Sequence, residues 1–547
     1  MKRHAMIWLF HKIRRRIPLL CVVALLGSAT AVLGVLFALA TRRIIDAAVS
    51  GEGFLPACLL ELSIICALLL CGGANRALSQ WLSCRLDRDW KQELLRDLLS
   101  GDYAQTTSYH TGELINRINN DVRTVDDGLV SGLPGALSML VRLIAAMVVL
   151  AALWPRFALA LLICGILMIA ATGFVRRRLK DLHKRVSESE GKVLSFIQEV
   201  LEKLLVVQAM DLSGEAGRRA DALLEDRWLL QRRQRRVSLL TGVGTSVGYY
   251  AAGLSVLVAC GWSLMRGAMT FGTLTAVMQL FDQLQSPFLG LSGLLPRYAA
   301  TMASAERLME LETIRPARRR RECRSADEIA ARNVTFSYGE GALIDNATFT
   351  VPQGAFTAVT GASGSGKSTL LKLLLGVYRP ASGSLVARSG GEEISLSDGT
   401  RGLFAYVPQG NLLFSGTLRE NLLLVRPQAG EEELTQAIRA AAMDEYLPQL
   451  PQGLDTPLGE NGAGLSEGQA QRVAIARAVL CGAPVLLLDE ATGALDVETE
   501  RVVLRRLAAL DGRTCIVVTH RPAALEMARI RLDVTDGRVT QTYRDEY

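Results

Sequence analysis

Long apolar runs alternate with basic segments in the first half of the chain. The runs long enough to span a membrane lie at residues 17–41, 54–74, 129–153, 157–175, 239–265 and 274–295. About 20 consecutive apolar residues cross the hydrocarbon core of a bilayer as an α-helix. The pattern therefore predicts an all-α polytopic transmembrane domain with six spans over residues 1–312.

Lysine and arginine are distributed unevenly around these runs. They are abundant before residue 17, in residues 76–123 and 176–236 and after residue 297, whereas the short connections carry only Arg42, Arg43, Arg156 and Arg266. Positive charge accumulates on the cytoplasmic side of a membrane protein. We therefore expect both termini and both long connections to be cytoplasmic, and the protein to lie in a cell membrane such as a bacterial inner or plasma membrane.

The segments next to the spans indicate further helices. Residues 1–16 combine basic and apolar residues, which is typical of an amphipathic helix on the membrane surface. A signal peptide is the alternative, but the apolar run that follows is longer than a signal core. Both long connections are predicted to be helical, with breaks at residues 101–110 and 190–198. We expect these breaks to contact the second half of the same chain, although solvated helices would show a similar pattern.

Polar residues inside two of the spans are candidates for lining a cavity. One helical face of the sixth span carries Gln279, Asp282, Gln283 and Ser286, and Arg142 lies near the middle of the third. A charge at the bilayer centre costs about 2.5–3.5 kcal/mol, so it is expected to face a partner or water. These five residues are predicted to line a substrate cavity, with hydrogen bonding inside the helix bundle as the alternative.

Composition supports a membrane protein and argues against nucleic acid as a partner. Half of the 547 residues are hydrophobic (50%), and the mean hydropathy is +0.24. The net charge is +7, but the basic residues cluster beside the apolar runs. Ten cysteines occur without a C-x-x-C pair, so neither a disulfide framework nor a metal site is expected. Residues 313–328, with four consecutive arginines, form a predicted linker.

The pattern changes at residue 329, where short alternating strands begin. Within the predicted domain of residues 329–547, an apolar strand leads into a glycine-rich loop and then a helix. The loop fits G-x-x-x-x-G-K-[ST] and consists of Gly361, Ala362, Ser363, Gly364, Ser365, Gly366, Lys367, Ser368 and Thr369. Such a loop points backbone N–H groups at phosphate oxygens. It predicts an α/β P-loop NTPase that binds ATP, with Lys367 on the phosphates and Ser368 on Mg²⁺.

Two later strands end in candidate catalytic groups. An apolar run ends at Asp489 and Glu490, and a second ends before His520. A carboxylate behind a phosphate loop can hold Mg²⁺, and its neighbour can deprotonate the attacking water. We therefore predict Asp489 as a metal ligand, Glu490 as the general base and His520 as a sensor of the γ-phosphate.

The sequence Leu465-Ser-Glu-Gly-Gln469, followed by Gln471 and Arg472, resembles the signature motif of ATP-binding cassette (ABC) transporters. The whole chain resembles exporter-type half-transporters, in which six spans precede one nucleotide-binding domain. The resemblance implies that Tyr338 stacks on adenine and that Gln409 touches Mg²⁺ and takes part in catalysis. It also implies that segment 458–460 couples to the membrane helices of the partner subunit. For a dimer, it implies that Ser466, Gly468, Gln469 and Asp496 complete the ATP site of the partner subunit.

Two positions depart from the family pattern, because Gly493 replaces the usual serine and Glu467 a common glycine. Neither is expected to abolish hydrolysis, and a homodimer or a heterodimer fits the sequence. The predicted function is ATP-driven export of an amphipathic small molecule, lipid or peptide by a dimer in the bilayer. Uptake of a metal chelate such as a siderophore is the alternative transport function. A non-transporting ABC ATPase is disfavoured by the six spans.

Overall fold

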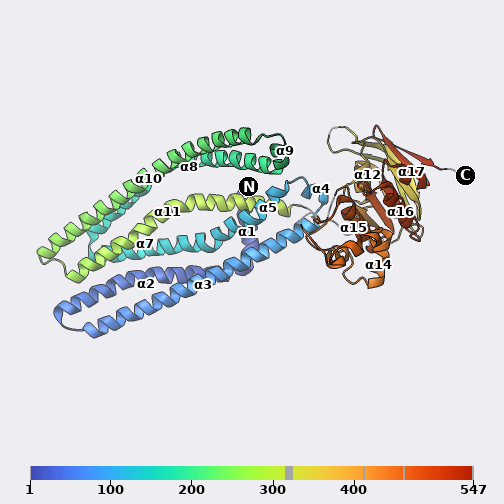
Figure 1. Ribbon diagram of the computed structural model, residues 1–547. Helices are drawn as coiled ribbons and strands as arrows, with labels where there is room; N and C mark the ends of the chain where they lie inside the picture. The colour runs from blue at the N-terminus through green and yellow to red at the C-terminus, as the bar shows by residue number, and fades with distance from the viewer. Residues whose placement is uncertain are drawn as a thin grey trace. The chain divides into compact units, whose positions relative to one another are not determined.

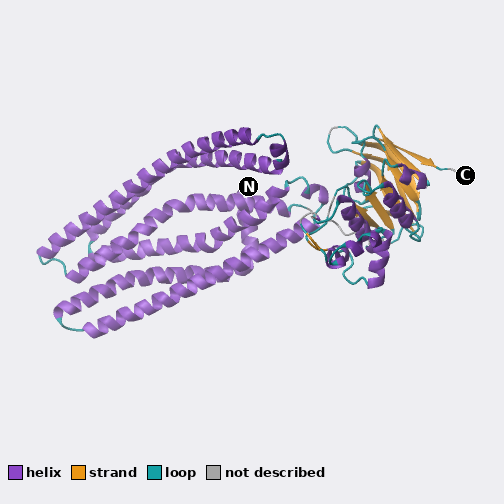
Figure 2. Cartoon of the chain, viewed as in Figure 1, coloured by secondary structure: helices purple, strands orange, loops and turns teal. Residues whose placement is uncertain are grey.

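A computed structural model describes residues 2–314, 325–339, 341–410, 413–459, 462 and 464–544, without side chains at 2, 160, 164, 166–178, 180, 286, 289, 291, 292, 295 and 398. Contacts divide the chain into two units, residues 1–96 with 110–313 and residues 97–109 with 314–547. Long helices make up the first unit, and every described strand belongs to the second (Figure 2). The predicted linker lies largely outside the described residues.

The helices of the first unit are long and run beside one another (Figure 1). Their bounds are α1 Lys2–Ile13, α2 Ile17–Ser50, α3 Phe54–Ser100, α5 Thr111–Asn116, α6 Val122–Asp126, α7 Leu133–Leu153, α8 Pro155–Glu202, α9 Leu204–Ala209, α10 Ser213–Met265 and α11 Phe271–Glu312. Two π-helical segments, Arg117–Asp121 and Asp127–Gly132, join α5, α6 and α7 into one rod. The last residues of α3 belong to the second unit.

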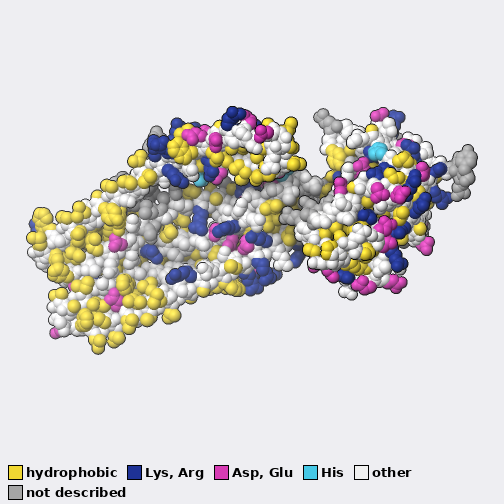
Figure 3. Space-filling model, viewed as in Figure 1, with side chains coloured by type: hydrophobic (Ala, Val, Ile, Leu, Met, Phe, Trp, Pro, Cys, Tyr) yellow, Lys and Arg dark blue, Asp and Glu magenta, His cyan; other side chains and the backbone are white. Residues whose placement is uncertain are grey.

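Each of the six predicted spans lies within one of these long helices. Four described helices are long and apolar enough to cross a membrane: Arg3–Ser50, Phe54–Ser100, Thr111–Leu153 and Ser213–Met265. Hydrophobic side chains dominate the visible surface toward the end where α2 turns into α3 (Figure 3). The other two predicted spans lie in α8 and α11, and most side chains of the fourth span are outside the described residues.

Small residues let α2, α7 and α11 pack closely. A Cβ added at Gly27 of α2 would lie 2.3 Å from Ser138 Oγ of α7, and one at Gly290 of α11 would lie 2.7 Å from Met139 Sδ. Gln283 of α11 donates to the Gly34 carbonyl of α2 at 2.8 Å. Close backbone approach and interhelical hydrogen bonds stabilise helices where water is absent. These three helices therefore form the core of the bundle.

The amphipathic helix predicted at the N-terminus is α1. Ala5, Leu9 and Ile13 are buried, whereas Ile7 and Phe10 are about 60% exposed (59% and 61%). The 4-residue spacing of the buried set gives the helix one inward face. Trp8 and Lys12 donate to the carboxylate of Glu312 at the end of α11, which fixes α1 against that helix.

The break predicted at residues 190–198 is wrong, because α8 continues to Glu202 without interruption. A single glycine, Gly191, costs a helix only about 1 kcal/mol. The neighbouring α10 supports this part of α8, since Arg227 donates to Glu190 at 2.8 Å. The chain turns further on, at Lys203 and around Asp211, which has a left-handed φ of 51°.

The second unit contains a six-stranded sheet in the order β12-β11-β3-β10-β9-β6 and a four-stranded sheet in the order β2-β1-β4-β5. The strands are β1 Glu328–Phe336, β2 Ile344–Pro352, β3 Phe356–Thr360, β4 Ser382–Ser389, β5 Glu392–Ser395, β6 Phe404–Val407, β9 Val485–Asp489, β10 Thr514–Val518, β11 Ile530–Thr535 and β12 Arg538–Tyr543, with a short pair, β7 Gly416–Thr417 and β8 Pro457–Leu458. Strands β11, β3, β10, β9 and β6 are parallel.

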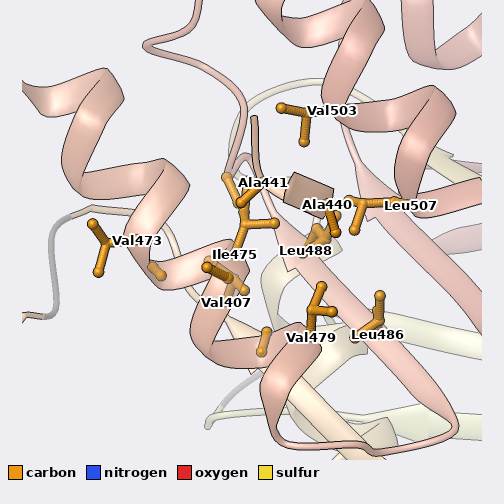
Figure 4. Packing of buried hydrophobic residues seen from close by; sticks show 14 of the residues in the cluster. Val407, Ala440, Ala441, Val473, Ile475, Val479, Leu486, Leu488, Val503 and Leu507 are labelled. Carbon is orange, nitrogen blue, oxygen red and sulfur yellow. The ribbon is translucent and has the colours of Figure 1, made fainter. Parts of the chain in front are cut away.

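Each face of the six-stranded sheet covers a separate hydrophobic core. One core lies between this sheet, the four-stranded sheet and α12 Lys367–Leu374. The other lies under α13 Leu418–Leu423, α14 Glu431–Ala440, α15 Glu467–Leu480, α16 Val497–Ala508 and α17 Pro522–Met527. Figure 4 shows Ile475 and Val479 of α15 packed toward Leu486 and Leu488 of β9. Because both faces are covered, the central strands are continuously apolar.

Residues 97–109, which begin in the last turn of α3, belong to the second unit because of their contacts. They contain the short helix α4 Tyr103–Thr106, whose first turn is capped by Asp102. The Tyr103 ring lies edge-on to Tyr378, with centroids 5.9 Å apart. This confirms the prediction that the break at residues 101–110 contacts the nucleotide-binding part of the chain.

Candidate functional site

The candidate site lies where four parallel strands of the six-stranded sheet end. Val518 of β10 pairs with Val359 of β3 and with Asp489 of β9, and Leu488 of β9 pairs with Val407 of β6. The carboxyl ends of these strands therefore meet at one edge of the sheet, which is where α/β proteins place ligands. The segments that follow the strands carry the phosphate loop, His520, Glu490 and Gln409.

The phosphate loop connects β3 to α12 through backbone conformations that favour glycine. Gly361, Gly364 and Gly366 have φ values of 145°, 80° and 104°. A Cβ at Gly361 would lie 2.2 Å from the carbonyl oxygen of Val534, so a larger residue would displace the backbone. Lys367 begins α12 and donates to the carbonyls of residues 361 and 362 at 2.8 Å. Its ammonium group is thereby held at the loop, in front of a helix N-terminus.

Asp489 lies at the end of β9, beside the hydroxyl group that follows Lys367. Ser368 Oγ donates to Asp489 Oδ1 at 3.0 Å, and the Tyr406 hydroxyl donates to Oδ2 at 3.1 Å. Burial raises the pKa of Asp489 above its usual range, although both hydrogen bonds oppose the shift. A buried carboxylate beside a serine hydroxyl is a suitable pair of oxygen ligands for Mg²⁺.

Glu490 is held in an unusual backbone conformation. Its φ is 50°, a left-handed value that is costly for a residue with a Cβ. Its N–H donates to the Val518 carbonyl at 3.2 Å, and its carboxylate accepts from Gln409 Nε2 at 2.7 Å. The strained turn and the amide together orient the carboxylate at the edge of the sheet. His520 is exposed two residues beyond the end of β10.

Tyr338 follows β1 and is the candidate adenine contact. Its side chain is 59% exposed, and its hydroxyl lies 3.2 Å from Thr369 Oγ1 in α12. Its ring packs against Phe336 and Tyr378 at centroid distances of 5.0 and 5.4 Å. Burial and hydrogen bonding with Tyr338 raise the pKa of Tyr378 to about 12. The aromatic cluster and the contact with Thr369 hold the Tyr338 ring beside the phosphate loop.

The signature segment forms the start of α15. Ser466 is the N-cap and accepts from Gln469 N at 3.3 Å, while the Gln469 side chain accepts from Ser466 N at 2.9 Å. This capping box fixes the exposed helix N-terminus. A Cβ at Gly468 would lie 2.9 Å from the Ala494 carbonyl, so the absence of a side chain lets the next loop pack against the helix. Glu467 occupies the first turn of α15, where a negative charge is favourable.

The loop between Glu490 and Asp496 packs on the signature helix. Ala494 N donates to the buried Gln471 side chain at 3.0 Å, and Asp496 caps α16 by accepting from Thr499 N at 2.9 Å. This backbone hydrogen bond holds the pKa of Asp496 below its usual range. Gly493 lies in the same loop, and an added Cβ would lie 3.2 Å from the Glu490 carbonyl. A serine there would require only a small shift.

Two residues of this region, Tyr406 and Arg521, were not predicted from the sequence. Tyr406 binds Asp489, as described above, and Arg521 contacts the buried Glu500 and the carbonyls of Gly493 and Leu495. Of the two, Arg521 is the one that the sequence could have suggested, because it directly follows His520. The pairing of β6 with β9, on which the contact of Tyr406 depends, has no local sequence signal.

The described contacts separate the predicted nucleotide ligands into two groups. Lys367, Ser368, Asp489, Glu490 and Gln409 are connected at the sheet edge. In the described part of the chain, no hydrogen bond or ion pair links Ser466, Gly468, Gln469 or Asp496 to that group. Glu460, in the predicted coupling segment, lies outside the described residues.

The five candidate cavity residues of the membrane unit also differ in their surroundings. Asp282 is exposed and accepts from the Tyr249 hydroxyl, whereas the amide nitrogen of Gln283 donates to the Gly34 carbonyl of α2. Gln279 is half-buried and its side-chain oxygen has no hydrogen-bond partner among the described residues; Arg142 is also half-buried. The side chain of Ser286 lies outside the described residues. Gln283 and Asp282 therefore both form a hydrogen bond to a neighbouring helix, as the bundle alternative expects, and Asp282 is in addition exposed.

Comparison with known proteins identifies the two parts of the chain. The ABC transporter transmembrane region matches residues 18–288, and the ABC transporter domain matches residues 344–493. The ATP-dependent lipid A-core flippase of Albidiferax ferrireducens is 31% identical over 484 residues, which cover 85% of this chain and 81% of that protein. The mycobactin import ATP-binding/permease protein IrtB of Mycolicibacterium thermoresistibile is 38% identical over 310 residues, covering 55% of this chain and 52% of that protein.

A solved structure has the same fold. It is a bacterial Atm1-family ABC exporter with ATP bound, with a TM-score of 0.79 and 23% sequence identity, covering 97% of this chain and 95% of that one. A helical membrane domain followed by a P-loop ATPase defines an ATP-driven membrane transporter. The chain belongs to the ABC transporter family and is an exporter-type half-transporter, a multi-pass protein of the cell membrane that binds and hydrolyses ATP as part of a dimer.

Proposed function

We propose that two copies of this chain form a homodimer that moves an amphipathic molecule out of the cytoplasmic leaflet or the cytoplasm. The observation that carries this proposal is the separation of two half-sites within one chain. Lys367, Asp489 and Glu490 lie together at the sheet edge, while Ser466 caps an exposed helix elsewhere. A second identical subunit supplies what each half-site lacks.

The proposed roles of the sheet-edge residues follow from their contacts. Lys367 and the loop N–H groups bind the β- and γ-phosphates, and the adenine stacks on the exposed ring of Tyr338. Ser368, Asp489 and Gln409 are the residues that would hold Mg²⁺, which supplies charge neutralisation on the phosphate oxygens when bound. Glu490, oriented by Gln409, accepts the proton of the attacking water, and His520 donates toward the γ-phosphate.

The signature helix is proposed to act across the dimer. Ser466 already accepts from its own helix through Oγ, which leaves its hydroxyl hydrogen free to donate to a phosphate oxygen. The N-terminus of a helix favours an anion. Asp496 and Gly493 lie in the loop beside this helix, and their proposed role is to report contact between subunits to Glu490.

The cargo is proposed to be amphipathic, as a lipid, a peptide or a small molecule with an apolar part. The membrane unit combines extensive exposed apolar surface with a few polar residues in α11. The lipid A-core flippase among the relatives is named for a lipid, which favours this class. Uptake of a metal chelate is the second candidate, because one relative is named for mycobactin import.

Reconstitution separates these directions of transport. The purified protein in liposomes, with the ATPase domains facing outward, should move amphipathic probes into the lumen when ATP is added. The Glu490→Gln variant is the control for leakage. Loss of preloaded metal chelate from the lumen, without accumulation of amphiphiles, would contradict export and support uptake.

The cavity is tested separately by cysteine accessibility. Cysteines at residues 279 and 282 should react with polar thiol reagents from the cytoplasmic side, whereas those at Leu280 and Leu284, which are buried in the bundle, should not. The native Cys260, also buried in a span, is replaced first to lower the background. Equal inertness at all four positions would show that the cavity lies elsewhere.

A further inference from the structure

Asp282 is an acidic residue in the interior of a predicted span. It lies 8 residues beyond residue 274, where the sixth predicted span begins. At 1.5 Å per residue this is about 12 Å along the helix from the outer end. The side chain is exposed on the surface of the helical unit, unlike its neighbours Phe281 and Leu284, which are buried. A carboxylate at this depth is strongly unfavourable against lipid, so this surface faces water, a partner or cargo.

The carboxylate is oriented by an aromatic group from the neighbouring helix. The Tyr249 hydroxyl of α10 donates to Asp282 Oδ1 at 2.5 Å. The Tyr249 ring stacks on Phe281 at a centroid distance of 5.2 Å with an interplanar angle of 15°. Tyr250 lies edge-on to Tyr249 at 5.4 Å and is 72% exposed. One carboxylate oxygen is thus fixed, beside two tyrosine rings.

The described residues leave the charge of Asp282 without a compensating cation. Tyr249 is its only hydrogen-bond partner in the part of the chain that the structure describes, and no described lysine or arginine forms an ion pair with it. By contrast, Asp46 near the outer end of α2 has Arg42 at 3.4 Å. The adjacent Gln283 donates its amide to the Gly34 carbonyl of α2, so this group is directed away from the carboxylate.

We propose that Asp282, with Tyr249 and Tyr250, binds a cationic group on the cargo. The inference rests on the proposed export of an amphipathic molecule and narrows it to amphipathic cations. A cation beside the free carboxylate oxygen gains a charge-assisted contact, and the neighbouring rings attract positive charge through their faces. Tyr249 acts as a positioning residue, because it holds the carboxylate through the hydrogen bond and through stacking on Phe281.

Two ions of the same shape and opposite charge provide the test. Tetraphenylphosphonium is the cation and tetraphenylborate the anion, and binding to the dimer in nanodiscs is measured by equilibrium dialysis. Empty nanodiscs are subtracted, because the dipole potential of a bilayer makes the two ions partition differently. The wild-type protein should bind the cation at least tenfold more tightly than the anion. Equal binding of both ions, or binding of neither, would overturn the proposal without any variant.

Substitutions test whether the Asp282 carboxylate causes the preference for the cation. Asp282→Asn should lose the preference, with cation binding weakened at least tenfold, and Asp282→Glu should restore part of it. Tyr249→Phe should weaken cation binding by a smaller factor, about threefold. Glu61→Gln is the matched control, because Glu61 lies in another predicted span and accepts from Thr41 at 2.9 Å. An Asp282→Asn protein that binds the cation as tightly as wild type would overturn the assignment.

Failure of this inference is distinguishable from failure of the proposed function. If the cation preference is absent but ATP still drives amphiphiles into liposomes, export stands and Asp282 has another role. If liposome transport is also absent while ATP hydrolysis continues, the proposed cargo class fails as well.

Discussion

Arg521 donates to the carboxylate of Glu500 at 3.2 Å, although the two residues lie on different segments of the ATPase domain. Glu500 is only 1% exposed. The same guanidinium donates to the carbonyls of Leu495 at 2.6 Å and Gly493 at 2.5 Å. Because Arg521 directly follows His520, one side chain connects the segment of the proposed γ-phosphate sensor to the loop between Glu490 and Asp496, which packs on the signature helix.

We expect Arg521→Ala to destabilise the ATPase domain by about 3 kcal/mol, because among the described residues it leaves the buried Glu500 carboxylate with the Thr492 hydroxyl as its one hydrogen-bond partner. Arg506→Ala is the control. Arg506 pairs with Asp444 at an exposed site, so its removal should cost less than about 1 kcal/mol. Denaturant unfolding followed by fluorescence measures both changes. Equal stabilities of the two variants would show that Arg521 does not stabilise the buried Glu500 carboxylate.

Tyr406→Phe should reduce ATP hydrolysis by about tenfold while ATP binding is retained. The substitution removes one of the two hydrogen bonds to the buried Asp489, and an unsatisfied buried acceptor costs about 1–3 kcal/mol. The dependence of hydrolysis on Mg²⁺ concentration is the specific measurement, because a loosely held ligand should raise the concentration needed for half-maximal rate. An unchanged Mg²⁺ dependence would mean that Tyr406 has only a packing role.

Mixed dimers test whether the signature helix acts on the partner's nucleotide. Ser466→Arg and Lys367→Ala should each lose hydrolysis when alone. In a dimer that contains one subunit of each, one composite site carries both defects and the other carries neither. We expect part of the ATPase activity to return in a co-purified mixed dimer. If it hydrolyses no more than the single-variant dimers, sharing across the interface is contradicted, unless both sites are needed together.

The sequence predicts those parts of the site whose residue types are determined by the local backbone conformation or by the neighbouring residues in the chain. The phosphate loop was predictable because left-handed conformations at Gly361 and Gly366 leave a glycine pattern. Asp489 and Glu490 were predictable because an apolar strand ends at them. The role of Tyr406 was not, because it depends on the pairing of β6 with β9, which are about 80 residues apart in the chain.

The fold of the membrane unit was also only partly predictable from the sequence. Apolar runs predicted long helices at all six positions, since length and hydropathy are local properties. The face that each polar residue presents was only partly predictable. Gln283 and Asp282 are adjacent in the sequence, yet one bonds to α2 and the other to Tyr249 of α10. The break expected near Gly191 is absent, because α10, which is distant in the sequence, supports a continuous α8 there.

Glu490, oriented by Gln409, is proposed to activate the water that attacks ATP. The most direct test is single-turnover hydrolysis by a Glu490→Gln dimer, with ATP binding measured on the same sample. This variant keeps the phosphate loop and the size of the side chain but removes the proton acceptor. We expect hydrolysis to fall at least 100-fold, in line with loss of a general base, with ATP affinity unchanged and a closed, ATP-bound dimer trapped. Hydrolysis near the wild-type rate with normal ATP binding would contradict the claim.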